Sequence, residues 1–154
     1  MPHIERTANV VWEGNVARGA GTISAATSGA FSELGFSLPT RIGQAEGKTS
    51  PEELLAAAHG GCVTMSLAGE LTSAGTPPGR LEVTCTIVMD EVEGQGHQIV
   101  GSRVEIVARV DGVDDGALQA AVEKAHAGCP FSQLLERAGA SVTLSARLAD
   151  PPTT

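Results

Sequence analysis

The stretch TSPEELLAAAHGGCVTMSL, residues 49–67, carries the clearest helix signal in the chain and encloses a cysteine. Ser50 is a candidate N-cap, and Pro51 suits the first helical position. Two glutamates follow, where the exposed N–H groups of a first turn favour negative charge. The pattern predicts a helix that stops before Gly75, which is followed by prolines. Its alanine-rich middle, with two glycines before Cys62, indicates a closely packed central helix.

A second helical block surrounds another cysteine. It begins at Asp114 or Asp115, runs through ALQAAVEKAH and meets Pro130. Proline removes a hydrogen bond from a helix interior, so we expect the helix to break at Gly128 and Cys129. On this interpretation Cys129 caps a new short helix, where unsatisfied N–H groups favour a thiolate.

The remaining segments read as strands at both ends of the chain. Two stretches near the start, separated by turn-forming glycines and an asparagine, predict an antiparallel pair. Two longer stretches alternate apolar and polar residues and predict a hairpin with one wet face. A last strand follows the second helical block. The five segments are ERTANVVWEG (5–14), GAGTISAATS (19–28), RLEVTCTIVMDEV (80–92), HQIVGSRVEIVARVDG (97–112) and SVTLSARLA (141–149).

Composition narrows the function classes. The 154 residues fit a single domain, 1–154, and the formal charge of -8 leaves no basic face for nucleic acid. The start of the chain lacks a signal-peptide pattern, and no 18 uncharged apolar residues follow one another, so we expect a cytoplasmic protein without a membrane partner. In a reducing compartment the three cysteines should rest as thiols. Any disulfide between them is then transient and catalytic.

Four motifs resemble the OsmC/Ohr family of cysteine-based hydroperoxide reductases. They are VVWEGNVARGAGTIS, LPTRIG, TSPEELLAAAHGGC and KAHAGCPFSQLL, and together they span most of the chain. The first, the TR pair and the AAAH sequence are more similar to the osmotically inducible OsmC branch than to the organic-hydroperoxide-resistance branch. The resemblance implies an α+β, two-layer fold with antiparallel sheets packed on central helices. It also implies an intertwined homodimer with the active site at the interface.

The resemblance implies a role for each of four residues. Cys62 matches the peroxidatic cysteine and Cys129 the resolving cysteine, while Arg41 and Glu52 match the charged pair that activates the thiol. A free thiol is mostly protonated at neutral pH, so a fixed cation is needed to favour the thiolate. The substrates implied are organic hydroperoxides and, less efficiently, hydrogen peroxide. An external dithiol, such as a lipoyl-type one, would reopen the disulfide, and we expect no cofactor.

Several residues leave alternatives open. Cys85 lies on the apolar face of its strand and is expected to be core, and Arg18 is a rival for the role of Arg41. His59 could pair with Cys62 three residues on, but a packing or hydrogen-bonding role is the stronger expectation. No CxxC or HxxxH spacing supports a metal site. Two other functions stay open, a Cys–His hydrolase using Cys129 and His126, and a non-catalytic ligand-binding protein.

Helix geometry raises one question about the predicted site. Glu52 and Cys62 are ten positions apart, which on a straight helix corresponds to about 15 Å of rise. Either the helix bends at Gly60 and Gly61, or the arginine and its carboxylate come from a second protomer. We favour the second, because the resemblance implies an active site at a dimer interface and glycine alone does not force a kink.

Overall fold

A computed structural model describes residues 3–150 and has an α+β fold, as predicted. It forms two compact units, residues 1–54 and 55–154, and the expected single domain stays a prediction. The first unit contains β1 (Ala8–Glu13), β2 (Ala20–Ala25), β3 (Leu34–Phe36), α1 (Leu38–Ile42) and the start of α2 (Pro51–Ser73). The second contains the rest of α2 and five further elements: β4 (Arg80–Val92), β5 (Gly96–Arg109), α3 (Asp115–Gly128), α4 (Pro130–Arg137) and β6 (Ser141–Leu148).

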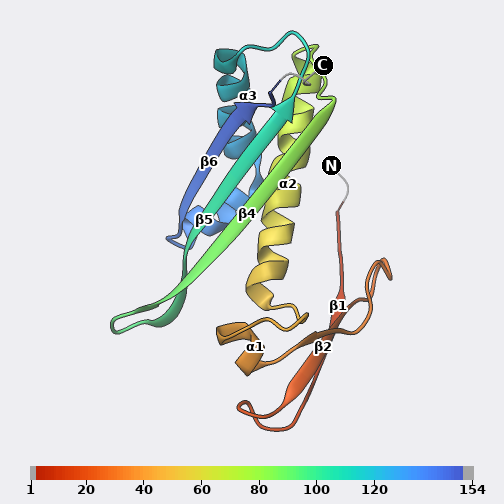
Figure 1. Ribbon diagram of the computed structural model, residues 1–154, viewed down its shortest axis with the longest axis vertical. Helices are drawn as coiled ribbons and strands as arrows, with labels where there is room; N and C mark the ends of the chain where they lie inside the picture. The colour runs from red at the N-terminus through yellow and green to blue at the C-terminus, as the bar shows by residue number, and fades with distance from the viewer. Residues whose placement is uncertain (1–2, 151–154) are drawn as a thin grey trace. The chain divides into compact units, whose positions relative to one another are not determined.

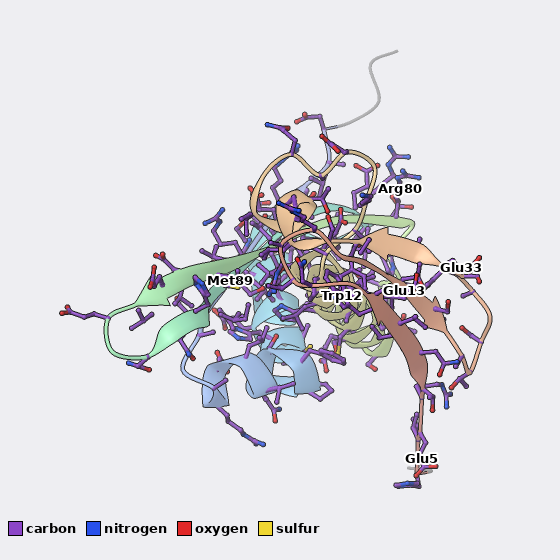
Figure 2. All side chains as sticks on the ribbon, turned by 90° about the horizontal axis from the view of Figure 1, so that it is seen from below. Glu5, Trp12, Glu13, Glu33, Arg80 and Met89 are labelled. Carbon is purple, nitrogen blue, oxygen red and sulfur yellow. The ribbon has the colours of Figure 1, made fainter. Side chains whose placement is uncertain are left out.

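The first unit is built on a three-stranded antiparallel sheet in the order β1-β2-β3. Its first two strands are the predicted pair. Trp12, labelled on β1 in Figure 2, is paired with Gly21, which in turn is paired with Phe36. The two aromatic rings meet with centroids 5.4 Å apart. A Cβ at Gly21 would come within 2.5 Å of the Phe36 ring, so this contact requires glycine.

Two short elements of the first unit were not predicted. β3 has only three residues, too few for an alternating pattern to stand out. The helix α1 contains Arg41. Ser37 caps this helix by accepting a hydrogen bond from the backbone N–H of Thr40, and Pro39 lies in its first turn. Arg41 is thus held on a helical turn.

The helix α2 follows its sequence signals closely. Ser50 Oγ accepts a hydrogen bond from the backbone N–H of Glu53 at 3.1 Å, and Gly75 beyond the helix end has a φ of +82°. The chain stays helical through Gly60 and Gly61. In the described part of the chain, α2 is the one helix whose length and composition would allow it to cross a membrane.

The second unit contains a three-stranded sheet in the order β4-β5-β6. The long β4–β5 hairpin is antiparallel, as predicted, with an irregularity between Val88 and Met89. The last strand differs from the expected antiparallel arrangement, because β6 pairs with β5 in parallel. A parallel neighbour needs a long crossover, and α3 and α4 supply it.

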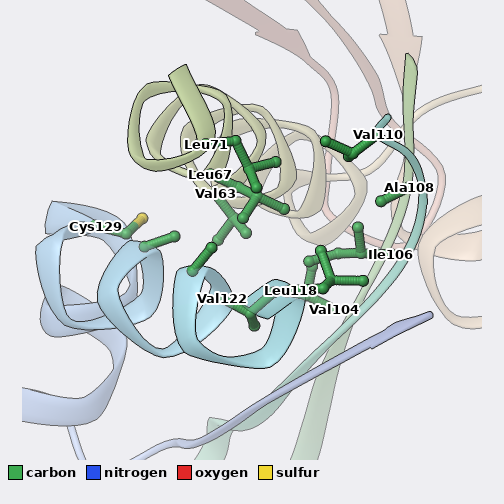
Figure 3. Close-up of a cluster of buried hydrophobic side chains, with 12 residues drawn as sticks. Val63, Leu67, Leu71, Val104, Ile106, Ala108, Val110, Leu118, Val122 and Cys129 are labelled. Atoms are coloured by element: carbon green, nitrogen blue, oxygen red, sulfur yellow. The ribbon is translucent and has the colours of Figure 1, made fainter. Parts of the chain in front are cut away.

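Helices α2 and α3 pack on one face of this sheet and enclose the core (Figure 1). The alternation of β5 correctly predicts which of its residues face the core, because Val104, Ile106 and Ala108 are buried. Figure 3 shows Cys129 at the edge of the same cluster. The remaining members of the core come mainly from the two helices: Val63, Leu67, Leu71, Val110, Leu118, Ala121, Val122 and Ala125.

The two glycines of α2 have different surroundings. A Cβ at Gly60 would lie 3.1 Å from Cβ of Cys85 on β4, so the helix approaches the sheet closely there. A Cβ at Gly61 would meet nothing within 4 Å. Of the two glycines, Gly60 therefore lies in the close packing that the sequence predicted, and Gly61 does not.

Candidate active site

Two of the predicted site residues lie side by side in the second unit. Sγ of Cys62, on α2, is 3.0 Å from Sγ of Cys129, which precedes α4. Both are free thiols in this structure. Cys129 is 0% exposed, whereas Cys62 is partly exposed. A reagent from solvent therefore reaches Cys62 first.

The position of Cys129 follows from the proline after it. The helix α3 ends at Gly128, and Cys129 has an extended backbone with φ -80° and ψ 114° before Pro130 begins α4. The helix break predicted from the sequence is confirmed. It leaves Cys129 at the N-terminus of α4, where backbone N–H groups have no partner within the helix.

The surroundings shift the pKa values of the two thiols in opposite directions. Burial raises the pKa of Cys62, and its hydrogen bond to Cys129 raises it further. Burial also acts to raise the pKa of Cys129, but hydrogen bonds from Cys62, from Ser132 and from the Phe131 N–H outweigh it, and the pKa of Cys129 is lowered. The lowered pKa of Cys129 agrees with the thiolate that its position at a helix N-terminus predicted. Because the pKa of Cys62 is raised, an activated Cys62 needs a further positive charge.

The other two predicted residues form an ion pair in the first unit. Nε of Arg41 donates to Oε1 and Oε2 of Glu52 at 3.1 and 3.0 Å, and Nη2 donates to Oε1 as well. Hydrogen bonding to Arg41 lowers the pKa of Glu52, and the same contact raises the pKa of Arg41. The forked geometry fixes the guanidinium plane. The alternative candidate, Arg18, lies in the turn between β1 and β2.

A small apolar hollow adjoins Arg41 in the same unit. Its volume is about 180 Å³. Aromatic and aliphatic side chains make up most of its wall, which comprises Trp12, Val16, Phe36, Ser37, Leu38, Arg41 and Pro51. A charged donor beside an apolar hollow suits a molecule with one polar end and one hydrocarbon end.

His59 has the packing and hydrogen-bonding role that was the stronger expectation for it. It is fully buried, and its ring nitrogens contact hydroxyl groups, with Nδ1 2.8 Å from Oγ of Ser102 and Nε2 2.8 Å from Oγ of Ser132. Among the hydrogen bonds of the described residues, the one contact of His59 with a sulfur atom joins its Nδ1 to Sγ of Cys85, at 3.8 Å. No spacing in the sequence joins residues on α2, β5 and α4, so this cluster was not foreseen.

The alternative chemistries find little support in the described residues. Nε2 of His126 lies 2.9 Å from Oε1 of Glu136, and its contact with Cys129 is the backbone hydrogen bond that its carbonyl accepts. A Cys–His nucleophile would instead need the imidazole on the sulfur. Within residues 3–150 no group of three or more His, Cys, Asp and Glu side chains is arranged to hold a metal.

Comparison with known proteins gives the class. The family model described as OsmC-like protein matches residues 43–145, and the chain belongs to this family, as its motifs predicted. The chain is 34% identical over 145 residues to peroxiredoxin OsmC of Escherichia coli strain K12, covering 94% of this chain and 97% of the relative. It is 32% identical over 112 residues to an organic hydroperoxide resistance protein of Xanthomonas axonopodis pv. citri, covering 71% and 75% of the two chains.

Solved structures agree on the fold. An organic hydroperoxide resistance protein from Elizabethkingia anophelis superposes with a TM-score of 0.73 at 26% identity, covering 97% of this chain and all of that one. The organic hydroperoxide resistance protein OhrB of Bacillus subtilis has a TM-score of 0.71 at 24% identity, covering 92% and 98% of the two chains.

Proposed function

We propose that the protein is a thiol-dependent peroxidase that reduces organic hydroperoxides, and hydrogen peroxide less efficiently. The observation that carries the proposal is the 3.0 Å approach of the Cys62 and Cys129 sulfur atoms. A disulfide bond is about 2.05 Å long, so a movement of about 1 Å would join them. The names of the relatives, a peroxiredoxin and a hydroperoxide resistance protein, support the same chemistry.

The reaction begins at the more accessible thiol. The Cys62 thiolate attacks one peroxide oxygen, so an S–O bond forms, the O–O bond breaks, and the alkoxide takes a proton to leave as an alcohol. The Cys129 thiolate then attacks the sulfenic sulfur, an S–S bond forms, and hydroxide leaves and is protonated to water. An external dithiol reduces the bridge and is itself oxidised. A reducing cytoplasm, with a lipoyl-type or similar dithiol, would supply that step.

Arg41 supplies the missing charge in this scheme. The pKa of Cys62 is raised by the surroundings within its own unit, so a fixed cation must act on it before attack. A guanidinium held by Glu52 offers a permanent positive charge for the thiolate and the departing oxygen. The apolar hollow beside Arg41 favours a peroxide with a hydrocarbon group.

We also propose that the active unit is a homodimer. All six residues of β1 are exposed, including Val10 and Val11, and Met65 on the apolar helix α2 is 73% exposed. Unpaired strand edges and exposed apolar side chains of this kind are what a second copy would cover. Sedimentation of the purified protein should give the mass of two chains.

The test is peroxide consumption by the purified protein with a dithiol reductant, comparing an alkyl hydroperoxide with hydrogen peroxide. Cys62→Ser should abolish turnover, and Cys129→Ser should allow one round that leaves Cys62 as a sulfenic or over-oxidised acid. Cys85→Ser is the control and should retain activity. Peptide mapping should find a Cys62–Cys129 bridge after oxidation. A bridge through Cys85, or equal residual activity of the first two variants, would contradict the assignment.

A further inference from the structure

A buried hydrogen bond joins the two segments that contain the paired thiols. Nε2 of His59, on α2, lies 2.8 Å from Oγ of Ser132, on α4, and both side chains are 0% exposed. A serine hydroxyl can donate or accept, so this bond forms with either tautomer of the imidazole. Burying two such groups is costly unless they are paired. The reaction proposed above uses neither residue.

Ser132 and Cys129 belong to one rigid turn. The carbonyl of Cys129 accepts a hydrogen bond from the backbone N–H of Gln133 at 3.1 Å, which closes the first turn of α4. Pro130 lies inside that turn and restricts its backbone further. A contact that holds Ser132 therefore also limits where the Cys129 sulfur can lie.

The spacing of this bond matches that of the thiol pair. On α2, His59 precedes Cys62 by three residues. At the start of α4, Ser132 follows Cys129 by three residues. Residues three apart lie on the same side of a helix. The 2.8 Å contact of His59 with Ser132 and the 3.0 Å approach of the two sulfur atoms are therefore neighbouring contacts between the same two segments.

Apolar packing alone would orient the short helix α4 poorly. The helix has eight residues, too few to be stable in isolation, so its place depends on what it packs against. Leu135 is buried and Phe131 packs on the core. Contacts of this kind are not directional, whereas a hydrogen bond restricts both a distance and an angle. The bond to His59 therefore adds an orientation that apolar contacts do not provide.

The sheet holds the other side of the histidine ring. Nδ1 of His59 lies 2.8 Å from Oγ of Ser102 on β5, which is also 0% exposed. The imidazole thus has a hydroxyl partner at each nitrogen, and the rigid ring connects β5 to α4. This arrangement fixes the ring before Ser132 contacts it.

We propose that His59 and Ser132 are positioning residues for closure of the disulfide, because their hydrogen bond holds the Cys129 sulfur against that of Cys62. The proposal rests on the proposed function for the step in which it acts. In that step the Cys129 thiolate attacks the sulfenic sulfur, the S–S bond forms, the S–O bond breaks, and the hydroxide that leaves is protonated to water. Sulfur atoms already in contact favour this step over further oxidation of the sulfenic acid.

The test measures how strongly the folded protein favours the disulfide, in a reaction that needs no peroxide. In mixtures of oxidised and reduced dithiothreitol, Cys62 and Cys129 give two electrons and two protons to the disulfide of the reagent and form their own S–S bond. Peptide mapping after an acid quench gives the fraction of protein with this bridge. Ser132→Ala should lower the equilibrium constant about two- to tenfold, the range for one hydrogen bond, because the reduced variant can place its two thiols apart.

The matched control is Ser102→Ala. Ser102 is as buried as Ser132 and lies at the same distance from the same imidazole, but it is on β5 and not in the turn that contains Cys129. A contact that stabilises the thiol and disulfide forms equally leaves their equilibrium unchanged. Ser102→Ala should therefore lower the unfolding temperature about as much as Ser132→Ala does and change the exchange constant by less than about twofold.

Two amides in place of His59 test each ring nitrogen separately. A glutamine amide extends about as far as Nε2 of histidine, an asparagine amide about as far as Nδ1, and both can donate and accept. His59→Gln should keep the contact with Ser132 and an exchange constant near that of wild type. His59→Asn should keep the contact with Ser102 and lower the constant as Ser132→Ala does. Because both variants lose the ring, the comparison also corrects for weaker folding.

An unchanged exchange constant in Ser132→Ala would overturn the proposal, and so would equal constants for His59→Gln and His59→Asn. With one equivalent of alkyl hydroperoxide, Ser132→Ala should form the sulfenic acid at the wild-type rate and close the disulfide more slowly than wild type. If the wild-type protein forms no sulfenic acid, the proposed peroxidase function fails, while the dithiothreitol exchange still decides the role of His59 and Ser132.

Discussion

At the scale of single residues, the second unit contains one accessible and one buried thiol side by side, and the first unit contains the Arg41–Glu52 ion pair. In the proposed reaction Cys62 acts first because it is the more accessible thiol, although its pKa is the raised one of the pair. The proposed function gives the charge that would reverse this tendency to Arg41, whose guanidinium is hydrogen-bonded to Glu52. Two predictions about this ion pair follow from its geometry.

Replacing Arg41 should slow peroxide reduction more than it affects folding. We expect Arg41→Ala to lower the rate by roughly 100-fold or more, the usual effect of losing one preorganised electrostatic group. Arg41→Lys should recover only part of the loss, since an ammonium lacks the planar fork. Stopped-flow oxidation of Cys62 measures this, with Arg18→Ala as the control. A larger effect from Arg18→Ala would transfer the role to that residue.

Glu52 should make stability depend on pH in a defined window. Its pKa in the folded protein is lowered, so its ion pair stabilises the fold above the unfolded pKa of about 4.3 and loses this effect as the pH falls through the lower folded value. Glu52→Gln should therefore unfold at a lower temperature than wild type at pH 7 and at the same temperature in strong acid. A difference that persists unchanged in acid would show that the carboxylate charge is not responsible.

At the scale of elements, α2 contributes to the core and contains Cys62. Its two glycines, Gly60 and Gly61, can be compared directly. Gly61→Ala should stabilise the protein by up to about 1 kcal/mol, because alanine is the better helix former and nothing opposes its methyl group. Gly60→Ala should give less or even destabilise, because its Cβ would lie 3.1 Å from that of Cys85. Denaturant unfolding of both variants measures this, and equal effects would contradict the close packing.

The same elements show what the sequence could predict. Capping residues and prolines are local signals, and they placed α2, α3 and α4 almost to the residue. The alternation of β4 and β5 likewise identified the core face. The parallel pairing of β6 depends on the long crossover through α3 and α4, and no local pattern encodes it. The cluster around His59 escaped prediction because its members meet only in the folded unit.

At the scale of the whole molecule, the proposed homodimer allows the cation for each Cys62 to come from the partner chain. Arg41 and Glu52 are paired within one chain and would travel together into a partner's site. Refolding Cys62→Ser protein together with Glu52→Ala protein should then restore part of the activity, because a hybrid dimer contains one site with both wild-type residues. Peroxide turnover of the refolded mixture measures it.

The control replaces the Cys62→Ser chain by one that carries both substitutions, which leaves no intact site in any hybrid. Native mass spectrometry confirms that the hybrids form. If they form without recovering activity, each site is built from a single chain, and α2 would have to bring Glu52 within reach by bending.

The late position of β6 also bears on how the chain is made. While a ribosome synthesises the protein, β4 and β5 can pair at once, but the other edge of β5 stays open until α3 and α4 have been completed and β6 has emerged. An open strand edge invites pairing with neighbouring chains. The charged side chains of Arg103, Glu105 and Arg109 alternate along that strand and are exposed, and charged side chains on an open strand disfavour pairing with another chain.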